Sequence, residues 1–250
     1  MRSTNSFSMR RALILCLISM LLFSGCASIK QAWNKIFGGE EEKSAQELVW
    51  EGMDNYDNGD YKDAIKSFEQ LRDWYPFSKY AILAELKIAD SHYQLQQYDE
   101  AIVSYEEFER LHPNNEAIPY IIYQIGRSNF DQISTIDRDQ TATRKALEAF
   151  QRLQKQFPDD PYAHRAEDHI NVCLKDLAGH DYIIGLFYYR TKHYKAALDR
   201  FKSVLSNYPD VGYHQQALQH IAECESILRK QEGQAGPAIE SSGTPKTSTD

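Results

Sequence analysis

The histidines that could do acid–base or metal chemistry are badly spaced for it. Ligands or catalytic partners on one helix must lie three or four residues apart to share a face. His164 and His169 are five residues apart, and His214 and His220 are six apart. Neither pair predicts a metal site.

The acidic cluster at Glu106, Glu107 and Glu109 is explained more simply as a solvated helix face than as paired catalytic carboxylates. The chain also contains no phosphate-cradling glycine loop, zinc-ligand spacing or serine–histidine–aspartate order. We therefore expect a binding protein that is not an enzyme and that uses no cofactor or metal.

The composition favours a helical protein that binds something other than nucleic acid. The 250 residues include 28 Lys and Arg against 36 Asp and Glu, a net charge of −8. Such a chain lacks the basic face that neutralises phosphates, so we expect no nucleic-acid partner. Only 12 Gly and 8 Pro are present, which is few for a β-fold with many turns.

One cysteine, Cys26, has a clear chemical role. Three arginines between positions 2 and 11 precede the apolar run 12–23, an order typical of a secretory signal peptide. That run is shorter than the ~20 residues that a membrane-spanning helix needs. Leu22-Phe23-Ser24-Gly25-Cys26 resembles the bacterial lipobox, in which the cysteine is acylated on sulfur and becomes the new N-terminus. We expect a signal peptide at 1–25 and a lipid on Cys26.

Lipidation also predicts a location. Several acyl chains on one residue anchor a protein stably, since each buried CH₂ contributes about 0.8 kcal/mol. Ala27 follows the cysteine, where inner-membrane lipoproteins tend to have aspartate. The resemblance implies a protein anchored in the cell outer membrane that faces the periplasm, with residues 26–43 as its lipidated tether. Translation could begin at Met1 or at Met9, because both precede basic residues.

The sequence leaves the pairing of Cys173 and Cys224 open. An oxidising compartment would allow a disulfide between them. Both cysteines nevertheless lie in helical patterns, where a free cysteine packs as a small hydrophobic residue. We favour two free thiols.

The body of the chain is a repeat. Ala64, Phe68, Leu71 and Pro76 follow one another at steps of 4, 3 and 5 residues. The first two steps place small, aromatic and aliphatic side chains on one helical face, and the proline then ends the helix. The same steps recur in three further units: Ala101, Tyr105, Phe108 and Pro113; Ala146, Phe150, Leu153 and Pro158; and Ala197, Phe201, Val204 and Pro209.

A small residue upstream of each unit predicts a second helix. Gly52, Ala89 and Gly185 each lie twelve residues before the repeat alanine, where they would let two antiparallel helices approach closely. The pattern resembles the tetratricopeptide repeat, a helix–turn–helix unit. We expect an all-α fold over residues 44–230: a right-handed tetratricopeptide-repeat solenoid of about 9–10 helices, made of four repeats plus a C-terminal helix.

The units are not evenly spaced. Gly126 lies 20 residues before Ala146, which implies eight extra residues in the turn between them. The pattern in residues 161–177 predicts extra helix that runs on into the fourth unit. A final helix from Tyr213 to about Arg229 should cap the array, and residues 231–250, rich in Gly, Ser, Thr and Pro, are expected to be disordered.

Aromatic residues outside the repeat consensus are the candidate binding residues. A groove lined by repeat helices can bind a peptide whose apolar side chains fill pockets between the helices. Each of these aromatics could instead fill the core, where such side chains lie more often. The candidate groove residues are Tyr75, Pro76, Phe77, Tyr80, Tyr120 and Tyr123.

The lipobox, the short tether and irregular repeats with Tyr75-Pro76-Phe77 after the first unit together resemble the BamD family. Its members are tetratricopeptide-repeat lipoproteins of the outer-membrane β-barrel assembly machine. The resemblance covers about residues 45–228. It implies that the N-terminal repeats bind the C-terminal targeting strand of an unfolded barrel precursor, which carries alternating aromatic residues.

The resemblance also implies a second contact. The C-terminal repeats would dock on a periplasmic domain of the barrel insertase, in the company of other assembly-machine lipoproteins. Asp199-Arg200-Phe201 matches the family segment that carries an arginine at that interface, so the resemblance assigns Arg200 to insertase binding. The chain departs from the family by ending before a full final repeat, which leaves the contacts of the family's last helix open.

Two other hypotheses are open. A periplasmic tetratricopeptide lipoprotein could serve pilus assembly or envelope division, although such proteins usually have more regular repeats or an added coiled coil. A peptidoglycan hydrolase could use the repeats as its binding module, but no unassigned segment is long enough for a catalytic domain. Depletion separates these hypotheses, because loss of a barrel-assembly factor should lower many porins together.

Overall fold

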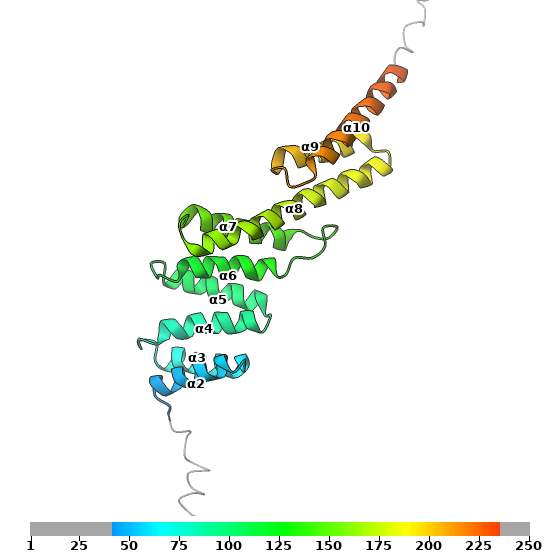
Figure 1. Ribbon diagram of the computed structural model, residues 1–250. Coiled ribbons are helices and arrows are strands. Elements are labelled where there is room, and N and C mark those ends of the chain that lie inside the picture. The colour runs from blue at the N-terminus through cyan, green and yellow to red at the C-terminus, as the bar shows by residue number, and fades with distance from the viewer. Residues whose placement is uncertain (1–41, 236–250) are drawn as a thin grey trace, which may run out of the picture. The chain divides into compact units, whose positions relative to one another are not determined.

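A computed structural model describes residues 42–235, and this part consists of nine α-helices without a β-strand (Figure 1). The all-α fold and the expected number of helices are therefore confirmed for the described residues. The helices are α2 (Ala45–Asp57), α3 (Tyr61–Trp74), α4 (Ala81–Gln94), α5 (Tyr98–Leu111), α6 (Ile118–Phe130), α7 (Thr141–Gln156), α8 (Pro161–Arg190), α9 (Tyr194–Asn207) and α10 (His214–Ala235).

The chain divides into two units, with the boundary between Leu48 and Val49. Of the first unit, the structure describes residues 42–48, which include the start of α2. Ser44 and Glu47 form a capping box there: the Ser44 backbone N–H donates to Glu47 Oε2 at 2.8 Å, and the Glu47 N–H donates to Ser44 Oγ at 3.3 Å. The Ser44 N–H and the Ser44 hydroxyl, which both donate to Glu47 Oε2, lower the pKa of Glu47.

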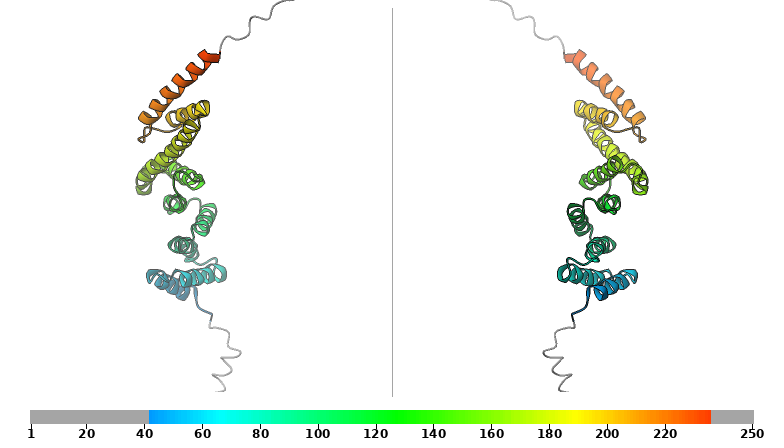
Figure 2. Two further views of the ribbon diagram at one scale, coloured as in Figure 1. Left: turned by 90° about the vertical axis from the view of Figure 1, so that its right-hand side faces the viewer. Right: turned by 90° about the vertical axis from the view of Figure 1, so that its left-hand side faces the viewer.

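In the second unit, each helix from α3 to α10 packs against the next one along the chain (Figures 1 and 2). In three helix pairs, a glycine of the first helix lies directly against the aromatic ring of the second. A Cβ atom at any of these glycines would come within 2.5–2.6 Å of that ring, so only glycine permits the approach. The pairs are Gly52 with Phe68, Gly126 with Phe150, and Gly185 with Phe201.

The enlarged third turn is confirmed as the segment 131–140 between α6 and α7. Buried Gln140 holds it together: its amide nitrogen donates to the carbonyl oxygens of Thr135 at 3.2 Å and Arg138 at 3.1 Å. Thr143 Oγ1 donates to the Gln140 amide oxygen at 3.0 Å. His180 Nδ1 ties the same segment to α8 through the Ile136 carbonyl oxygen, 2.6 Å away.

The prediction that extra helix runs on into the fourth unit is also confirmed, because α8 is one helix of 30 residues. Asp160 caps its start, where Oδ1 accepts the Tyr162 N–H at 2.8 Å and Pro161 occupies the first turn. The helix joins two hydrophobic clusters: Cys173 belongs to a cluster with α5, α6 and α7, and Ala178 to one with α9 and α10.

The last helix differs from its predicted end. Helix α10 extends to Ala235, so residues 231–235 are helical rather than part of a disordered tail. Residues 228–235 are mostly good helix formers, which explains the extension. The rest of the predicted tail (236–250), the signal peptide (1–25), Cys26 and most of the tether lie outside the described residues.

Cys173 and Cys224 are free and buried. They lie in different hydrophobic clusters. Burial raises the pKa of the Cys173 thiol to about 12 and also raises the pKa of Cys224. Both side chains are therefore protonated, unreactive parts of the core, as favoured from the sequence.

Candidate polypeptide-binding surfaces

The turn between α3 and α4 carries aromatic residues and is held by hydrogen bonds. Tyr75 caps the end of α3, its N–H donating to the Leu71 carbonyl at 3.0 Å, and the Ser78 N–H donates to the Tyr75 carbonyl at 2.9 Å. Ser78 Oγ accepts the Tyr80 N–H at 3.2 Å just before α4. These hydrogen bonds hold together the turn that carries Phe77.

Four large apolar side chains within ten residues are exposed at this turn. Phe77 has a relative exposure of 101%, the value of a side chain with no protein neighbour covering it. The other three are Trp74, Ile82 and Leu83. Exposed apolar side chains so close together in the chain make this turn a candidate site of interaction.

The predicted groove residues separate into two places. Tyr75, Pro76, Phe77 and Tyr80 lie at this turn, whereas Tyr120 and Tyr123 lie on α6. The Tyr120 hydroxyl donates to Asp90 Oδ1 at 2.7 Å, and the Tyr123 ring packs against Phe150, Tyr162 and His169. None of the six residues lines the pockets described below.

Asp90 of α4 organises a polar cluster that was not predicted from the sequence. This buried carboxylate accepts the hydroxyls of Tyr105 at 2.8 Å and Tyr120 at 2.7 Å, and it pairs with Lys87 Nζ at 2.9 Å. The Lys87 ammonium in turn lies 4.3 Å from the centre of the Tyr56 ring, a cation–π contact. One sequence feature could have indicated this cluster: Asp90, a charged residue, directly follows the small repeat residue Ala89.

The protonation states of this cluster follow from its burial and charge. Burial, reinforced by the negative charge of Asp90, raises the pKa of Tyr105 and of Tyr120. Both tyrosines therefore remain hydroxyl donors. Burial by itself would lower the pKa of Lys87, but the charge of Asp90 and its hydrogen bond outweigh that effect and raise it. The cluster is a stable set of ion pairs and hydrogen bonds rather than a proton-transfer site.

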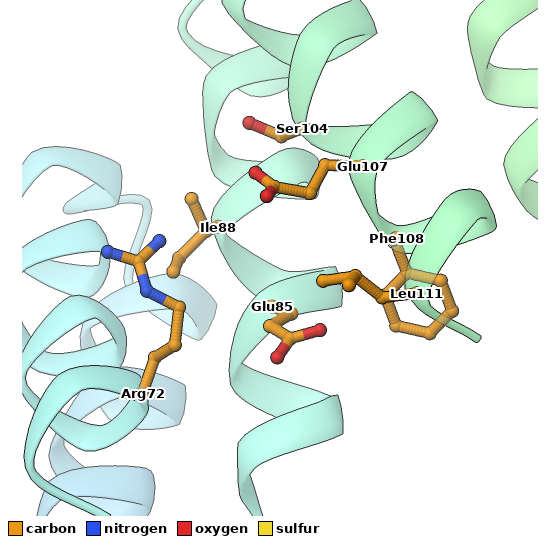
Figure 3. A pocket seen from close by; sticks show the side chains of 7 residues that line it. All are labelled: Arg72, Glu85, Ile88, Ser104, Glu107, Phe108 and Leu111. Atoms are coloured by element: carbon orange, nitrogen blue, oxygen red, sulfur yellow. The ribbon is translucent and has the colours of Figure 1, made fainter. Parts of the chain in front are cut away.

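A pocket of about 290 Å³ lies between α3, α4 and α5. Figure 3 shows Arg72 and Glu107 reaching into it from α3 and α5, with Glu85 and Ile88 of α4 between them. Glu85 Oε2 accepts a hydrogen bond from His112 Nε2 at 2.6 Å. Opposite charges over an apolar floor suit a polypeptide segment. None of these residues was predicted to bind.

One nitrogen of the Arg200 guanidinium is bound by another residue of the chain. Its Nη1 donates to Asp181 Oδ1 of α8 at 3.1 Å, while 45% of the Arg200 side chain stays exposed. Asp181 Oδ2 also accepts the Ser203 hydroxyl at 2.9 Å and the Tyr208 hydroxyl at 3.3 Å. Burial and the charge of Asp181 raise the pKa of Tyr208, which keeps its hydroxyl a donor.

Two further properties concern residues 42–235 alone. No group of three or more His, Cys, Asp or Glu side chains is arranged there to hold a metal ion. No helix in this range is both long and apolar enough to cross a bilayer.

The paired helices, the tight glycine–aromatic contacts and the exposed aromatic turn define an all-α tetratricopeptide-repeat protein. Its most prominent surface features are suited to binding polypeptide. Residues 41–235 match the YfiO family, described as outer membrane lipoprotein, and the chain belongs to this family.

Named relatives agree with this assignment. A protein of Rickettsia prowazekii is 31% identical over 212 residues, which cover 85% of this chain and 82% of that protein. A Caulobacter vibrioides protein is 30% identical over 200 residues, and the match spans 80% of this chain but only 65% of the relative. Both are named outer membrane protein assembly factor BamD. The resemblance to the BamD family is confirmed.

Similarity to solved structures is weaker. A tetratricopeptide-repeat protein of Thermus thermophilus is 15% identical at a TM-score of 0.40, with 72% of this chain and 100% of that chain covered. The family assignment therefore depends on the sequence comparisons.

Proposed function

We propose that this chain is an outer membrane protein assembly factor: a scaffold, not an enzyme, that binds unfolded β-barrel precursors and docks on the barrel insertase. It would be anchored through a lipid on Cys26 to the periplasmic face of the outer membrane, alongside other lipoproteins of the assembly machine. Membership of the outer membrane lipoprotein family and the names of the relatives support this proposal.

The observation that carries the proposal is the exposure of Phe77 on a hydrogen-bonded turn. The C-terminal targeting strand of a barrel precursor presents alternating aromatic side chains. Stacking such a ring on Phe77 or Trp74 would bury apolar area that is otherwise in water, and aromatic pairs gain about 0.5–1.5 kcal/mol beyond that burial. A preformed turn also avoids the cost of ordering a loop on binding.

Site-specific photo-crosslinking tests this assignment directly. A photo-reactive amino acid replaces Phe77 in the full-length, lipidated chain while a barrel precursor is being assembled. The matched control replaces Phe187, an exposed phenylalanine on α8. We expect adducts with the C-terminal strand of the precursor from position 77 and none from position 187. Equal adducts from both positions, or adducts only with other proteins, would contradict the assignment.

The docking half of the proposal concerns α8 and α9. Asp181 binds only one nitrogen of the Arg200 guanidinium, so the remaining donors stay available to a carboxylate of the insertase. Arginine is suited to this role because its planar fork can hold a carboxylate through two parallel hydrogen bonds. We propose that Asp181 orients Arg200 for this contact.

A further inference from the structure

Two cavities of about 320 and 440 Å³ lie beside one another between α5 and α7. They share four lining residues, so they form one continuous depression, which we call the α5–α7 groove. The shared residues are Ile102, Glu106, Asn129 and Lys145.

This groove is distinct from the surfaces assigned above. Ile125 and Asn129 line it from α6. At about 3.6 residues per turn, these two residues lie on the side of α6 opposite Tyr120 and Tyr123. None of the residues that line the pocket of Figure 3 lines the groove. The groove therefore needs its own explanation.

Asn129 gives the groove a specific hydrogen-bonding group. Its side chain is only 6% exposed, and its amide nitrogen donates to the Ile125 carbonyl oxygen at 2.9 Å. Because that carbonyl can only accept, the amide nitrogen must face it and Oδ1 must point away. Within residues 42–235, no donor is bonded to Oδ1. Among residues 42–235, the buried polar side-chain atoms without a partner are Arg127 Nε and Ser128 Oγ, so Asn129 Oδ1 is open to solvent and can accept an N–H from a ligand.

In the part of the chain that the structure describes, two charged residues that line both cavities have no partner of opposite charge. Neither Glu106 nor Lys145 forms an ion pair with another residue of the described part of the chain. At one end of the groove, Arg152 of α7 forms a bidentate ion pair with Glu109 of α5. At the other end, Asp99, Glu106 and Asp139 face the single cation of Lys145, so that end is acidic.

We propose that the α5–α7 groove binds an extended segment of another polypeptide that carries a basic residue between small apolar ones. An extended backbone has free N–H groups for Asn129 Oδ1 and free carbonyls for Lys145, whereas a helix satisfies both within itself. The acidic end selects the basic side chain by charge complementarity. Ile102, Ile125 and Ala149 provide an apolar floor.

Fluorescence anisotropy with the full chain tests the proposal. The probe is a labelled eight-residue peptide of alternating alanine and valine with a central arginine, and its partner has glutamate instead of arginine. We expect the arginine peptide to bind at least tenfold more tightly. Glu106→Gln should weaken that binding by about threefold to tenfold, because it removes the central acidic group. The matched control Glu116→Gln changes an exposed glutamate that lines none of the pockets described above, so it should leave binding unchanged.

A second variant separates main-chain recognition from charge. Asn129→Leu keeps the side-chain volume but removes the acceptor, so it should weaken both peptides by a similar factor. Equal affinity for the two peptides, or equal loss in the Glu106 and Glu116 variants, would overturn the proposal. Concentration-dependent dimerisation that Glu106→Lys abolishes, without peptide binding, would instead assign the groove to a second copy of the chain. Crosslinking at Phe77 does not depend on any of these results.

Discussion

The Arg200 guanidinium on α9 donates to the carboxylate of Asp181 on α8, with 3.1 Å between Nη1 and Oδ1. Asp181 is 8% exposed and also accepts the hydroxyls of Ser203 and Tyr208. One buried carboxylate thus joins the two helices and restrains the arginine that the family resemblance assigns to docking. Arg200 thus has two possible roles: it joins α9 to α8 through Asp181, and its exposed part could bind the insertase. Substitutions at positions 181 and 200 separate these roles.

Asp181→Asn should both destabilise the fold and weaken docking. An amide cannot accept on both sides as the carboxylate does, so one buried donor loses its partner at a cost of about 1–3 kcal/mol. Urea unfolding of the protein measures this loss of unfolding free energy. Asp199→Asn is the matched control, since Asp199 is exposed on α9 and should change stability by less than about 0.5 kcal/mol. Equal effects of the two substitutions would contradict a role for the Asp181 contact.

Arg200→Gln should weaken co-purification of the insertase while helix content stays intact. Glutamine retains one N–H donor for Asp181 but loses the charge and the forked geometry. Arg200→Glu is a poorer test, because it places a second carboxylate beside Asp181. Lys202→Gln, which removes an exposed cation two residues away, should have little effect. Insertase recovery equal to that of the unchanged chain would exclude Arg200 from docking.

Phe77→Ala and Phe68→Ala should have opposite signatures. Phe77 makes no buried contact, so its loss should change the unfolding free energy by less than about 0.5 kcal/mol while reducing precursor binding. Phe68 is fully buried against Gly52, so its loss should cost about 3–5 kcal/mol. Thermal unfolding and precursor binding measured on both variants check this. A strongly destabilised Phe77→Ala would show that the ring packs rather than binds.

Stability should fall at alkaline pH through the buried tyrosines. Burial, helped by the hydrogen bond to Asp131, raises the pKa of Tyr93 to about 12, and the pKa values of Tyr105 and Tyr120 are raised as well. A tyrosine whose pKa is higher in the folded than in the unfolded state stabilises the fold at any pH below its unfolded pKa of about 10. That stabilisation is lost as the pH rises through the folded pKa of about 12.

Circular dichroism and tyrosinate absorbance recorded together between pH 8 and 12.5 measure this effect. Helicity should hold to about pH 10 and then decline as the last tyrosines ionise. Tyr105→Phe and Tyr120→Phe should each flatten the decline. If every tyrosine ionises near pH 10 and full helicity is retained, the buried hydrogen bonds from the tyrosine hydroxyls to Asp90 would be contradicted.

Much of the fold could be predicted because its determinants are local. The steps from Ala64 to Pro76 encode one helix and its end, and the displaced Gly126 reveals the enlarged third turn. The glycine–aromatic contacts follow from the same spacing, since Gly52 and Phe68 meet wherever two such helices pair. The helical end of α10 was missed because one glycine at 233 lies among helix formers, and composition alone predicts a tail there.

The candidate sites were harder to predict, because their contacts join residues far apart in sequence. Tyr120 donates a hydrogen bond to Asp90, which is 30 residues away in the sequence, and Arg200 donates one to Asp181, which is 19 residues away. No local spacing encodes such pairs. Phe77 is the exception: it lies outside the repeat pattern, and the structure leaves it uncovered. The α5–α7 groove depends on the side-chain geometry of Asn129, which the sequence does not indicate.

Affinity purification of the native, lipidated chain in mild detergent would reveal whether this scaffold works with a barrel insertase. A large β-barrel protein should accompany the unchanged chain and the Phe77→Ala variant, and Arg200→Gln should reduce its recovery. Recovery of no β-barrel protein with the unchanged chain would contradict the proposal that this scaffold serves outer membrane protein assembly.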